Sequence, residues 1–460
     1  EKYLLQVNGR YDGTSRFMKD QRWNFFPSFS LGWNVARENF WKPLESVVNQ
    51  FKLRGSWGEL GNQNTSNLYP FYEILPVKSN SGNWLVNGGK TNTADIPSLV
   101  STLLTWERVR SFNVGFDFGA FSNRLTGSFD YFVRKTVDMV GPAPQLPLVL
   151  GIAPAIVNNA DMKSYGFEIE LSWRDRIGEV DYGVKFNLAD AQQKVVKYPN
   201  TTNAFSDWYA GKMSGEIWGY TSLGIAKTDE EMKEHLASLP NGGQNQLGNK
   251  WGAGDIMYAD INGDGKVDGG KGTLADPGDQ RIIGNSTPRY NFGLVLDASY
   301  KGFDVSIFFQ GVGKRDYAPI VGTNGAVFWG AVNNIWQSMA MEEHFDYFRP
   351  EGHPMGANLN GYYPRPDFTS NKNHQVQTRY LQDASYIRLK NLQIGYTLPK
   401  QWINKLHINR CRVYVSGDNL WTGTSLASMF DPETLAAGDW GSGKTYPLSK
   451  VISFGLNVNF

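Results

Sequence analysis

The chain has 460 residues, with 45 Lys and Arg against 44 Asp and Glu, so its formal net charge is +1. This balance argues against a nucleic-acid-binding protein, which normally carries a surplus of basic residues. The single Cys411 excludes an internal disulfide framework and a metal centre built from several thiolates. Aromatic residues make up 14% of the chain and 50 residues are glycine, well above the usual glycine share of roughly 7%. Such a composition is typical of long strands punctuated by glycine.

No segment of the sequence could cross a membrane as a helix. A spanning helix needs roughly 20 consecutive apolar residues, and the best run, Pro147 to Val157, is shorter and is interrupted by Gly151 and Pro154. A helical membrane protein is therefore excluded. The sequence starts at Glu1 without an initiator methionine or a signal-peptide pattern, so we expect it to be a piece of a longer chain.

Alternation of apolar and polar residues is the strongest signal in the sequence. At the end of the chain, Ile452, Phe454, Leu456, Val458 and Phe460 would share one face of a strand, while the residues between them are polar or glycine. The same pattern predicts twelve strands in chain order. They cover residues 2 to 10, 23 to 36, 51 to 59, 107 to 118, 125 to 134, 164 to 174, 180 to 190, 289 to 300, 303 to 312, 385 to 398, 411 to 418 and 450 to 460.

The connections between these strands alternate in length. Short ones are predicted at 37 to 50, 119 to 124, 175 to 179, 301 to 302 and 399 to 410, whereas the longest span residues 191 to 288 and 313 to 384. Short turns on one side and long extracellular loops on the other are typical of outer-membrane barrels, whose tilted strands need roughly 9 to 11 residues. We therefore predict an all-β fold, a transmembrane antiparallel β-barrel. A two-sheet sandwich, whose strands also alternate, is the alternative.

Two further features of the pattern fit a barrel. In the strand at 164 to 174, Glu168 and Glu170 fall on the face opposite to the aromatic residues, which indicates a wet interior. An aromatic girdle would place tryptophans near strand ends, although core packing could also use them. The tryptophans near predicted strand ends are Trp23, Trp57, Trp106, Trp173, Trp402 and Trp421.

The segment from Asp260 to Asp268 (DINGDGKVD) matches the first nine positions of a calcium loop, in which oxygens at alternate positions converge on one cation. The residues at these alternate positions are Asp260, Asn262, Asp264, Lys266 and Asp268. The twelfth position holds Lys271 instead of a bidentate Glu, so Asp276 or Asp279 would have to supply the missing oxygens. We expect a structural Ca²⁺ here, and the alternative is a polar turn without metal.

Other candidate site residues lie in the long loops. Four tryptophans could stack on sugars or other flat ligand surfaces, or could equally hold the loops together. They are Trp84, Trp208, Trp251 and Trp329. Thr228 and Glu231 form a capping box that predicts a short helix from Thr228 to Ala237.

The sequence predicts no catalytic residues and no organic cofactor. Its histidines show no metal-ligand spacing and have no companion nucleophile signature. Acidic neighbours such as Glu168 and Glu170 need no catalytic explanation on a wet strand face. We therefore expect that the chain is not an enzyme.

Several strings in the chain resemble one known family. They are YDGTSRF at 11 to 17, FPS at 26 to 28, LRGSWG at 53 to 58, GNQ at 61 to 63, DINGDG at 260 to 265, SYIRLKN at 385 to 391, GDNL at 417 to 420, DPE at 431 to 433 and the terminal Phe460. Together they resemble the C-terminal half of a SusC/RagA-family TonB-dependent outer-membrane transporter.

This resemblance implies a 22-stranded barrel of which the chain supplies the last twelve strands. It also implies a plug domain on the N-terminal side that contacts TonB, an upstream half of the barrel, and a SusD-like surface lipoprotein that covers the long loops. None of these parts is present in this chain. The implied function is TonB-dependent active import of oligosaccharides or oligopeptides across the outer membrane. The alternatives are a passive porin, a surface-adhesion or glycan-binding barrel, and a secreted glycan-binding β protein.

The resemblance also bears on the two ends of the chain. It places Phe460 where the outer-membrane insertion machinery recognises its clients, so we expect this residue to be an assembly signal. Since the upstream strands are missing, the strands at residues 3 to 8 and 451 to 459 should not pair with each other. The sheet is therefore expected to be open, with two unpaired edges.

Overall fold

The computed structural model describes residues 1–63, 65, 68–141, 149, 151–152, 154–319, 342–366, 372–404, 407–435 and 446–460. Twelve strands form one sheet in the order β1-β2-β3-β8-β9-β10-β11-β16-β17-β20-β21-β22, so neighbours in the sheet are also successive long strands of the chain. These strands are β1 (Tyr3–Gly13), β2 (Trp23–Asn34), β3 (Val48–Asn62), β8 (Glu107–Ala120), β9 (Leu125–Val140), β10 (Asn158–Ile177), β11 (Val180–Lys197), β16 (Arg289–Tyr300), β17 (Phe303–Lys314), β20 (Tyr386–Thr397), β21 (Arg410–Thr424) and β22 (Val451–Asn459).

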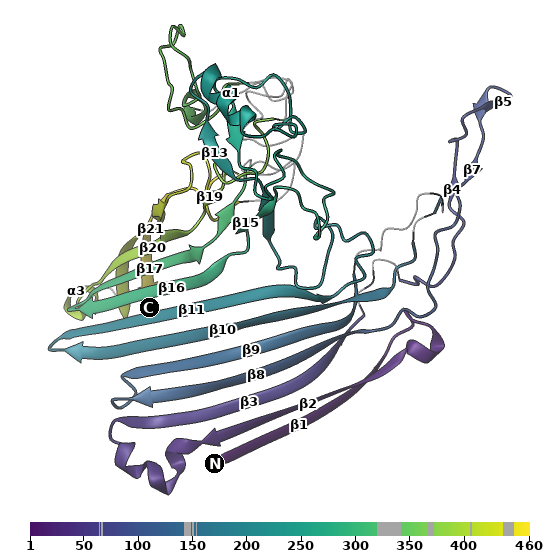
Figure 1. Ribbon diagram of the computed structural model, residues 1–460. Coiled ribbons are helices and arrows are strands. Elements are labelled where there is room, and N and C mark those ends of the chain that lie inside the picture. The colour runs from purple at the N-terminus through teal and green to yellow at the C-terminus, as the bar shows by residue number, and fades with distance from the viewer. Residues whose placement is uncertain are drawn as a thin grey trace. The chain divides into compact units, whose positions relative to one another are not determined.

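Shorter elements fill the connections between these strands (Figure 1). The small strands are β4 (Val77–Lys78), β5 (Leu85–Val86), β6 (Gly89–Lys90), β7 (Thr93–Ala94), β12 (Glu216–Gly219), β13 (Ser222–Ile225), β14 (Ile256–Tyr258), β15 (Arg281–Asn285), β18 (Asp316–Tyr317) and β19 (Gln382–Asp383). The helical elements are η1 (Lys19–Gln21), η2 (Val35–Arg37), η3 (Asn39–Leu44), α1 (Asp229–Ala237), η5 (Glu342–Phe345) and α3 (Lys400–Ile403). No described helix combines the length and the apolar character needed to cross a bilayer.

All twelve predicted strands are confirmed, and the sheet pairs whose register is known are antiparallel. The predicted bounds differ most for four strands: β9 ends at Val140 and β21 at Thr424, each six residues later than predicted, β10 begins at Asn158, and β11 ends at Lys197. The residues added to β10 and β11 are mostly polar, so the alternation of apolar and polar residues fades there although the strands continue. The connecting loops consequently cover residues 198 to 288 and 315 to 385.

The open strand order also agrees with expectation. β1 and β22 are the first and last strands of the order, and no pairing joins residues 3–8 to residues 451–459 in the part of the chain that the structure describes. β1 pairs with β2 through a continuous register from Tyr3 opposite Trp33 to Gly13 opposite Trp23. β22 pairs with β21, from Val451 opposite Asp418 to Asn459 opposite Arg410.

The short connections are tight for local reasons. Between β16 and β17 only Lys301 and Gly302 form the turn, and both have positive φ angles of 46° and 90°. Two successive residues of this kind make a type I′ hairpin turn, which matches the twist of the flanking strands. The connection from β2 to β3 is the longest of this group and contains η2 and η3, which the sequence did not predict.

The chain divides into two compact units. The first comprises Glu1–Asn123, Ser128–Phe167 and Ala191–Met213, and the second comprises Arg124–Gly127, Glu168–Asp190 and Ser214–Phe460. In the first unit, a small core forms where Phe17, Phe26, Leu104 and Trp106 pack together. Trp106 is fully buried there, so this tryptophan serves core packing instead of an aromatic girdle.

Candidate functional site

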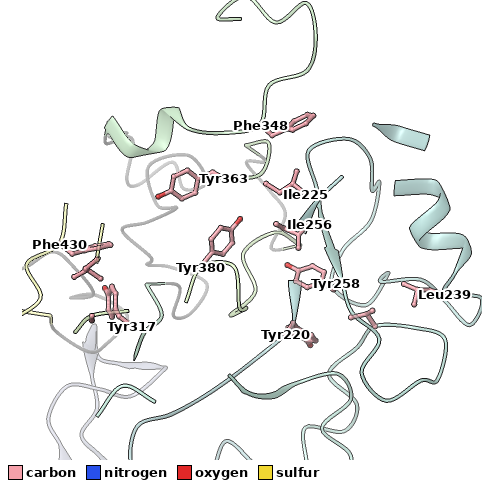
Figure 2. Packing of buried hydrophobic residues seen from close by; sticks show 13 residues of the cluster. Tyr220, Ile225, Leu239, Ile256, Tyr258, Tyr317, Phe348, Tyr363, Tyr380 and Phe430 are labelled. Atoms are coloured by element: carbon pink, nitrogen blue, oxygen red, sulfur yellow. The ribbon is translucent and has the colours of Figure 1, made fainter. Parts of the chain in front are cut away.

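In the second unit, three long loops pack into one hydrophobic cluster, which we call the outer loop cluster. Figure 1 shows α1, β13 and β19 gathered at the same end of β16, β17 and β20. Loop 198–288 supplies Tyr220, Ile225, Leu239, Ile256, Tyr258 and Val267. Loop 315–385 supplies Tyr317, Phe348, Tyr363, Tyr380 and Ala384, and loop 425–450 supplies Leu426 and Phe430. Figure 2 shows that these side chains come from separate segments and converge, so no single loop holds the core alone.

A buried charge network joins two of these loops. Asp255 is 0% exposed and forms an ion pair of 2.8 Å with Lys372, which is 1% exposed. Arg365 donates to both Asp255 oxygens, from Nε at 2.9 Å and from Nη2 at 2.7 Å. Asn373 Nδ2 donates to Asp255 Oδ1 at 2.9 Å. Because each buried charge has several partners, the network fixes loop 315–385 to loop 198–288.

Buried tyrosines surround this network. The Tyr258 hydroxyl donates to the backbone oxygen of Lys372 at 2.6 Å and accepts from Gln377 Nε2 at 3.1 Å. Burial raises the pKa of Tyr258 and of Tyr380 well above the usual value, so both stay neutral phenols. These two tyrosines therefore contribute to a packed scaffold.

A second charge network fixes loop 425–450 to the sheet. Arg388 of β20 is buried and donates to Asp431 and to Glu433, each at 2.7 Å, while Lys390 Nζ donates to Glu433 at 2.9 Å. Asp431 also accepts from the backbone N–H of Leu448 at 3.0 Å. The strings SYIRLKN and DPE of the sequence are therefore parts of one contact.

The calcium-loop-like segment is held by its own side chains. Asp260 accepts from the backbone N–H groups of Gly263 at 2.6 Å and Gly265 at 2.8 Å. Lys266 pairs with Asp268 at 2.5 Å, and this hydrogen bond is the main cause that lowers the pKa of Asp268. Within the described residues, no three His, Cys, Asp or Glu side chains are grouped closely enough to hold a metal ion. The Ca²⁺ site therefore stays a prediction.

Of the two carboxylates expected to complete this loop, Asp279 lies next to it and Asp276 does not contact it through a described hydrogen bond. Asp279 accepts from the backbone N–H of Ile261 at 2.7 Å and of Asp268 at 2.8 Å. Asp279 is fully buried, so it ties the start of the loop to its end.

The four candidate ligand-binding tryptophans are in different surroundings. Trp84 is exposed in the ribbon formed by β4 to β7, and Trp208 packs edge-on against Tyr198 with ring centroids 6.0 Å apart. Trp251 packs against the outer loop cluster, and Lys372 Nζ lies 5.2 Å from its ring. The Trp251 ring therefore contributes to packing within the loops. Trp329 lies outside the described residues.

The helix at the rim of the cluster forms as predicted. The Thr228 side chain accepts from Glu231 N at 3.1 Å, and α1 follows from Asp229 to Ala237. Glu231 reaches back to the backbone N–H of Lys227 at 2.6 Å, one residue earlier than in the standard capping box.

Ion pairs also lie on the polar face of the sheet within each unit. In the first unit, Arg54 of β3 donates to Asp130 of β9 from Nη1 at 2.9 Å and from Nη2 at 2.7 Å, and to Asp117 of β8 from Nε at 3.1 Å. In the second unit, Arg412 of β21 pairs with Asp304 of β17. A sheet with charged pairs on one face and exposed Phe, Leu and Ile on the other has one wet and one apolar surface.

A family model described as TonB dependent receptor-like, beta-barrel, matches residues 1–420. The chain belongs to this family. It is 29% identical over its whole length to TonB-dependent receptor P3 of Formosa agariphila, and 24% identical to TonB-dependent receptor SusC of Bacteroides thetaiotaomicron. It covers 44% and 42% of these two proteins, so the chain spans less than half the length of these curated relatives.

Solved structures give the same fold. The chain is similar to the structure of the RagAB peptide transporter, with a TM-score of 0.74, 22% identity, and coverage of 100% of this chain and 46% of that chain. The resemblance to SusC and RagA is confirmed, and the chain is part of an outer-membrane β-barrel. In such a barrel the polar face lines the interior, and the apolar face contacts lipid.

The sequence reasoning missed most residues of the outer loop cluster and its charge network. Asp255 and Lys372 are 117 positions apart, and neither lies in a periodic segment or a known motif. Strand periodicity carries no information on contacts between irregular loops. The DPE and SYIRLKN strings are visible in the sequence, but it does not indicate that they meet through Arg388.

Proposed function

We propose that this chain is the C-terminal part of a TonB-dependent importer that moves large nutrients, oligosaccharides or oligopeptides, across the outer membrane. The observation that carries the proposal is the family match over residues 1–420, which fits the twelve-stranded sheet with its polar interior face. The energy would come from TonB through a plug domain in the upstream part of the protein.

The outer loop cluster supports an extracellular role in substrate capture. Its three loops are packed and tied by buried ion pairs, so they present a stable rim to a partner or a substrate. We propose that a SusD-like surface lipoprotein covers these loops. One structural relative is described as a peptide transporter, and loop aromatics such as Trp84 and Trp208 also suit glycans.

The experiment is uptake of fluorescently labelled oligosaccharides and oligopeptides by cells that carry or lack the full-length gene. We expect uptake of one class only in cells with the gene, and we expect a protonophore or loss of TonB to abolish it. Uptake that persists without energy would identify a passive porin and refute active import. Copurification of a lipoprotein with the detergent-extracted transporter tests the partner.

We also propose that the segment from Asp260 to Asp268 holds Ca²⁺ in the working protein. Its support is the spacing of carboxylate and amide oxygens and the fully buried Asp279 beside them. Calcium titration of the full-length protein by isothermal calorimetry, with Asp264→Ala as the comparison, tests this. Equal heats for both proteins would count against the site.

A further inference from the structure

An apolar groove lies on the outward face of β1, β2 and β3, within the first unit and at the short-turn end of these strands. Its volume is about 400 Å³, within the range of about 300–1,000 Å³ typical of small-molecule sites. Its apolar lining is made by Tyr3, Leu5, Leu31, Trp33, Leu53 and Gly55. Leu5 is 71% exposed and lies on β1, an edge strand of the sheet that the described residues form.

Gly55 creates the gap in this surface. It pairs with Leu31 of β2 and with Val114 of β8, both of which carry apolar side chains on the same face. A Cβ atom added at Gly55 would meet no heavy atom within 4 Å. The missing side chain therefore leaves a depression between rows of apolar side chains, and a larger residue could fill it without a clash.

At one end, aromatic residues border the groove, and their polar atoms form its rim. The rings of Tyr3 and Trp33 stack with centroids 6.4 Å apart, and the edge of Phe40 from η3 packs against Trp33 at 6.4 Å. The Tyr3 hydroxyl and Trp33 Nε1 donate to Glu38 at 2.6 Å and 3.2 Å. Tyrosine and tryptophan with their polar atoms directed to one side are typical of the membrane–water boundary.

The turn after β2 extends this apolar surface. Phe40 is 63% exposed, and Leu44 and Val47 are also exposed, although they lie in a connection between strands. Lys2 Nζ pairs with Glu38 at 3.1 Å at the same rim, so both signs of charge are present there. The groove thus offers an apolar trough that ends at a zwitterionic patch.

We infer that this groove is a binding site for one glycerophospholipid of the periplasmic leaflet, with an acyl chain in the depression at Gly55 and a zwitterionic headgroup beside Lys2 and Glu38. The groove is continuous with the lipid-facing side of the barrel, so its occupant comes from the bilayer. An acyl chain fits a trough whose lining is mainly apolar, although Arg54 also borders it. Lys2 and Glu38 pair with each other at the rim, and opening this pair would offer one charge of each sign to a headgroup that carries an ammonium and a phosphate.

The test uses the full-length transporter, stripped of lipid in detergent and titrated with palmitoyl-oleoyl-phosphatidylethanolamine under native mass spectrometry. We expect one saturable phospholipid on the wild type and at least about tenfold weaker binding to Gly55→Phe, because the ring excludes methylene groups of the acyl chain. Ile394→Phe places the same aromatic ring at an exposed position of β20 and should bind like the wild type.

Folding of each variant is checked by the change in electrophoretic mobility between unheated and heated samples. Gly55→Val replaces Gly55→Phe if the larger residue prevents folding. Unchanged phospholipid binding in the Gly55 variant would overturn the inference, as would equal loss in Ile394→Phe. The same spectra report the number of chains. A wild-type dimer that dissociates in the Gly55 variant without a change in lipid binding would assign the groove to a second copy.

Discussion

Single buried charges decide how firmly the outer loops are held. Asp255 and Lys372 lie in different loops, and each is removed from water almost completely. Removal of one residue of such an ion pair lowers stability strongly, because its partner is then left buried and charged. Their positions could not be predicted from the sequence, since neither residue belongs to a repeating pattern.

The first prediction concerns Asp255→Ala. We expect this change to cost about 3–5 kcal/mol of local stability, because Lys372 would stay buried without its carboxylate partner. Hydrogen exchange in residues 249–258 and 372–380 should become faster, while exchange in the strands stays unchanged. Glu179→Ala removes one partner of the exposed pair with Lys301 and should have almost no effect. Equal protection of the loops in both variants would contradict this expectation.

The second prediction concerns His235 of α1. Burial lowers its pKa below the ordinary value of 6.5, although a hydrogen bond with Gln244 partly raises it. In the window below pH 6.5 the unfolded loop therefore binds more protons than the folded loop, so stability falls as the pH falls. One proton contributes at most about 1.4 kcal/mol per pH unit. Limited proteolysis of loop 198–288 at pH 7.5 and 5.5 should show this difference for the wild type and a smaller one for His235→Gln.

At the scale of elements, the sequence was informative where its pattern repeats. The alternation from Ile452 to Phe460 predicted β22, and a capping box at Thr228 predicted α1, because each depends on neighbours in the chain. The turn with η2 and η3 was missed, since its packing depends on the stacking of Trp41 on Phe51 and no strong local helix signal exists there. Patterns among neighbouring residues therefore predict the strands, whereas the loop structures depend on contacts between residues distant in sequence.

The third prediction concerns Asp264→Ala in the calcium-loop-like segment. Asp264 accepts from the backbone N–H of Lys266 at 3.1 Å and would also be a cation ligand. With calcium present, the variant should be cleaved faster within residues 258–270 than the wild type, and the barrel should stay folded. A chelator should remove most of this difference. If the chelator changes the cleavage rate of neither protein, the loop keeps its conformation without a metal ion.

The fourth prediction concerns Phe460, which is 85% exposed and follows the last residue of β22. As an assembly signal it would be read by the insertion machinery and would add little to the folded barrel. Deletion of Phe460 should lower the amount inserted in the outer membrane and leave synthesis unchanged, whereas Phe460→Trp should insert normally. Membrane fractionation with immunoblotting measures both. Equal insertion after deletion would reject the role.

At the scale of the whole molecule, the strand order ends at β1 and β22, which no pairing among the described residues joins. An unpaired edge in lipid leaves backbone groups without partners, at a cost of several kcal/mol for each group. We therefore expect the free edges of β1 and β22 to pair with strands outside this sequence. This arrangement was predictable from the family resemblance, whereas alternation alone also allowed a small closed barrel.

The fifth prediction tests this directly by disulfide trapping in the full-length protein with Cys411 replaced by serine. Cysteines at positions 5 and 31 should form a disulfide, because Leu5 and Leu31 are direct partners in the β1–β2 register. Cysteines at positions 5 and 456 should stay reduced. Trapping of the second pair would mean that β1 and β22 are neighbours and that the importer proposal must be withdrawn.

The shared core of the outer loop cluster has a consequence for redesign. Tyr258, Tyr380 and Phe430 come from three different loops, yet each is buried in one cluster. A single loop grafted from a relative would arrive without its aromatic partners and would leave cavities in the other two loops. Changes of ligand preference in this protein should therefore succeed when all three loops are exchanged as one cassette, and such loops should be inherited together.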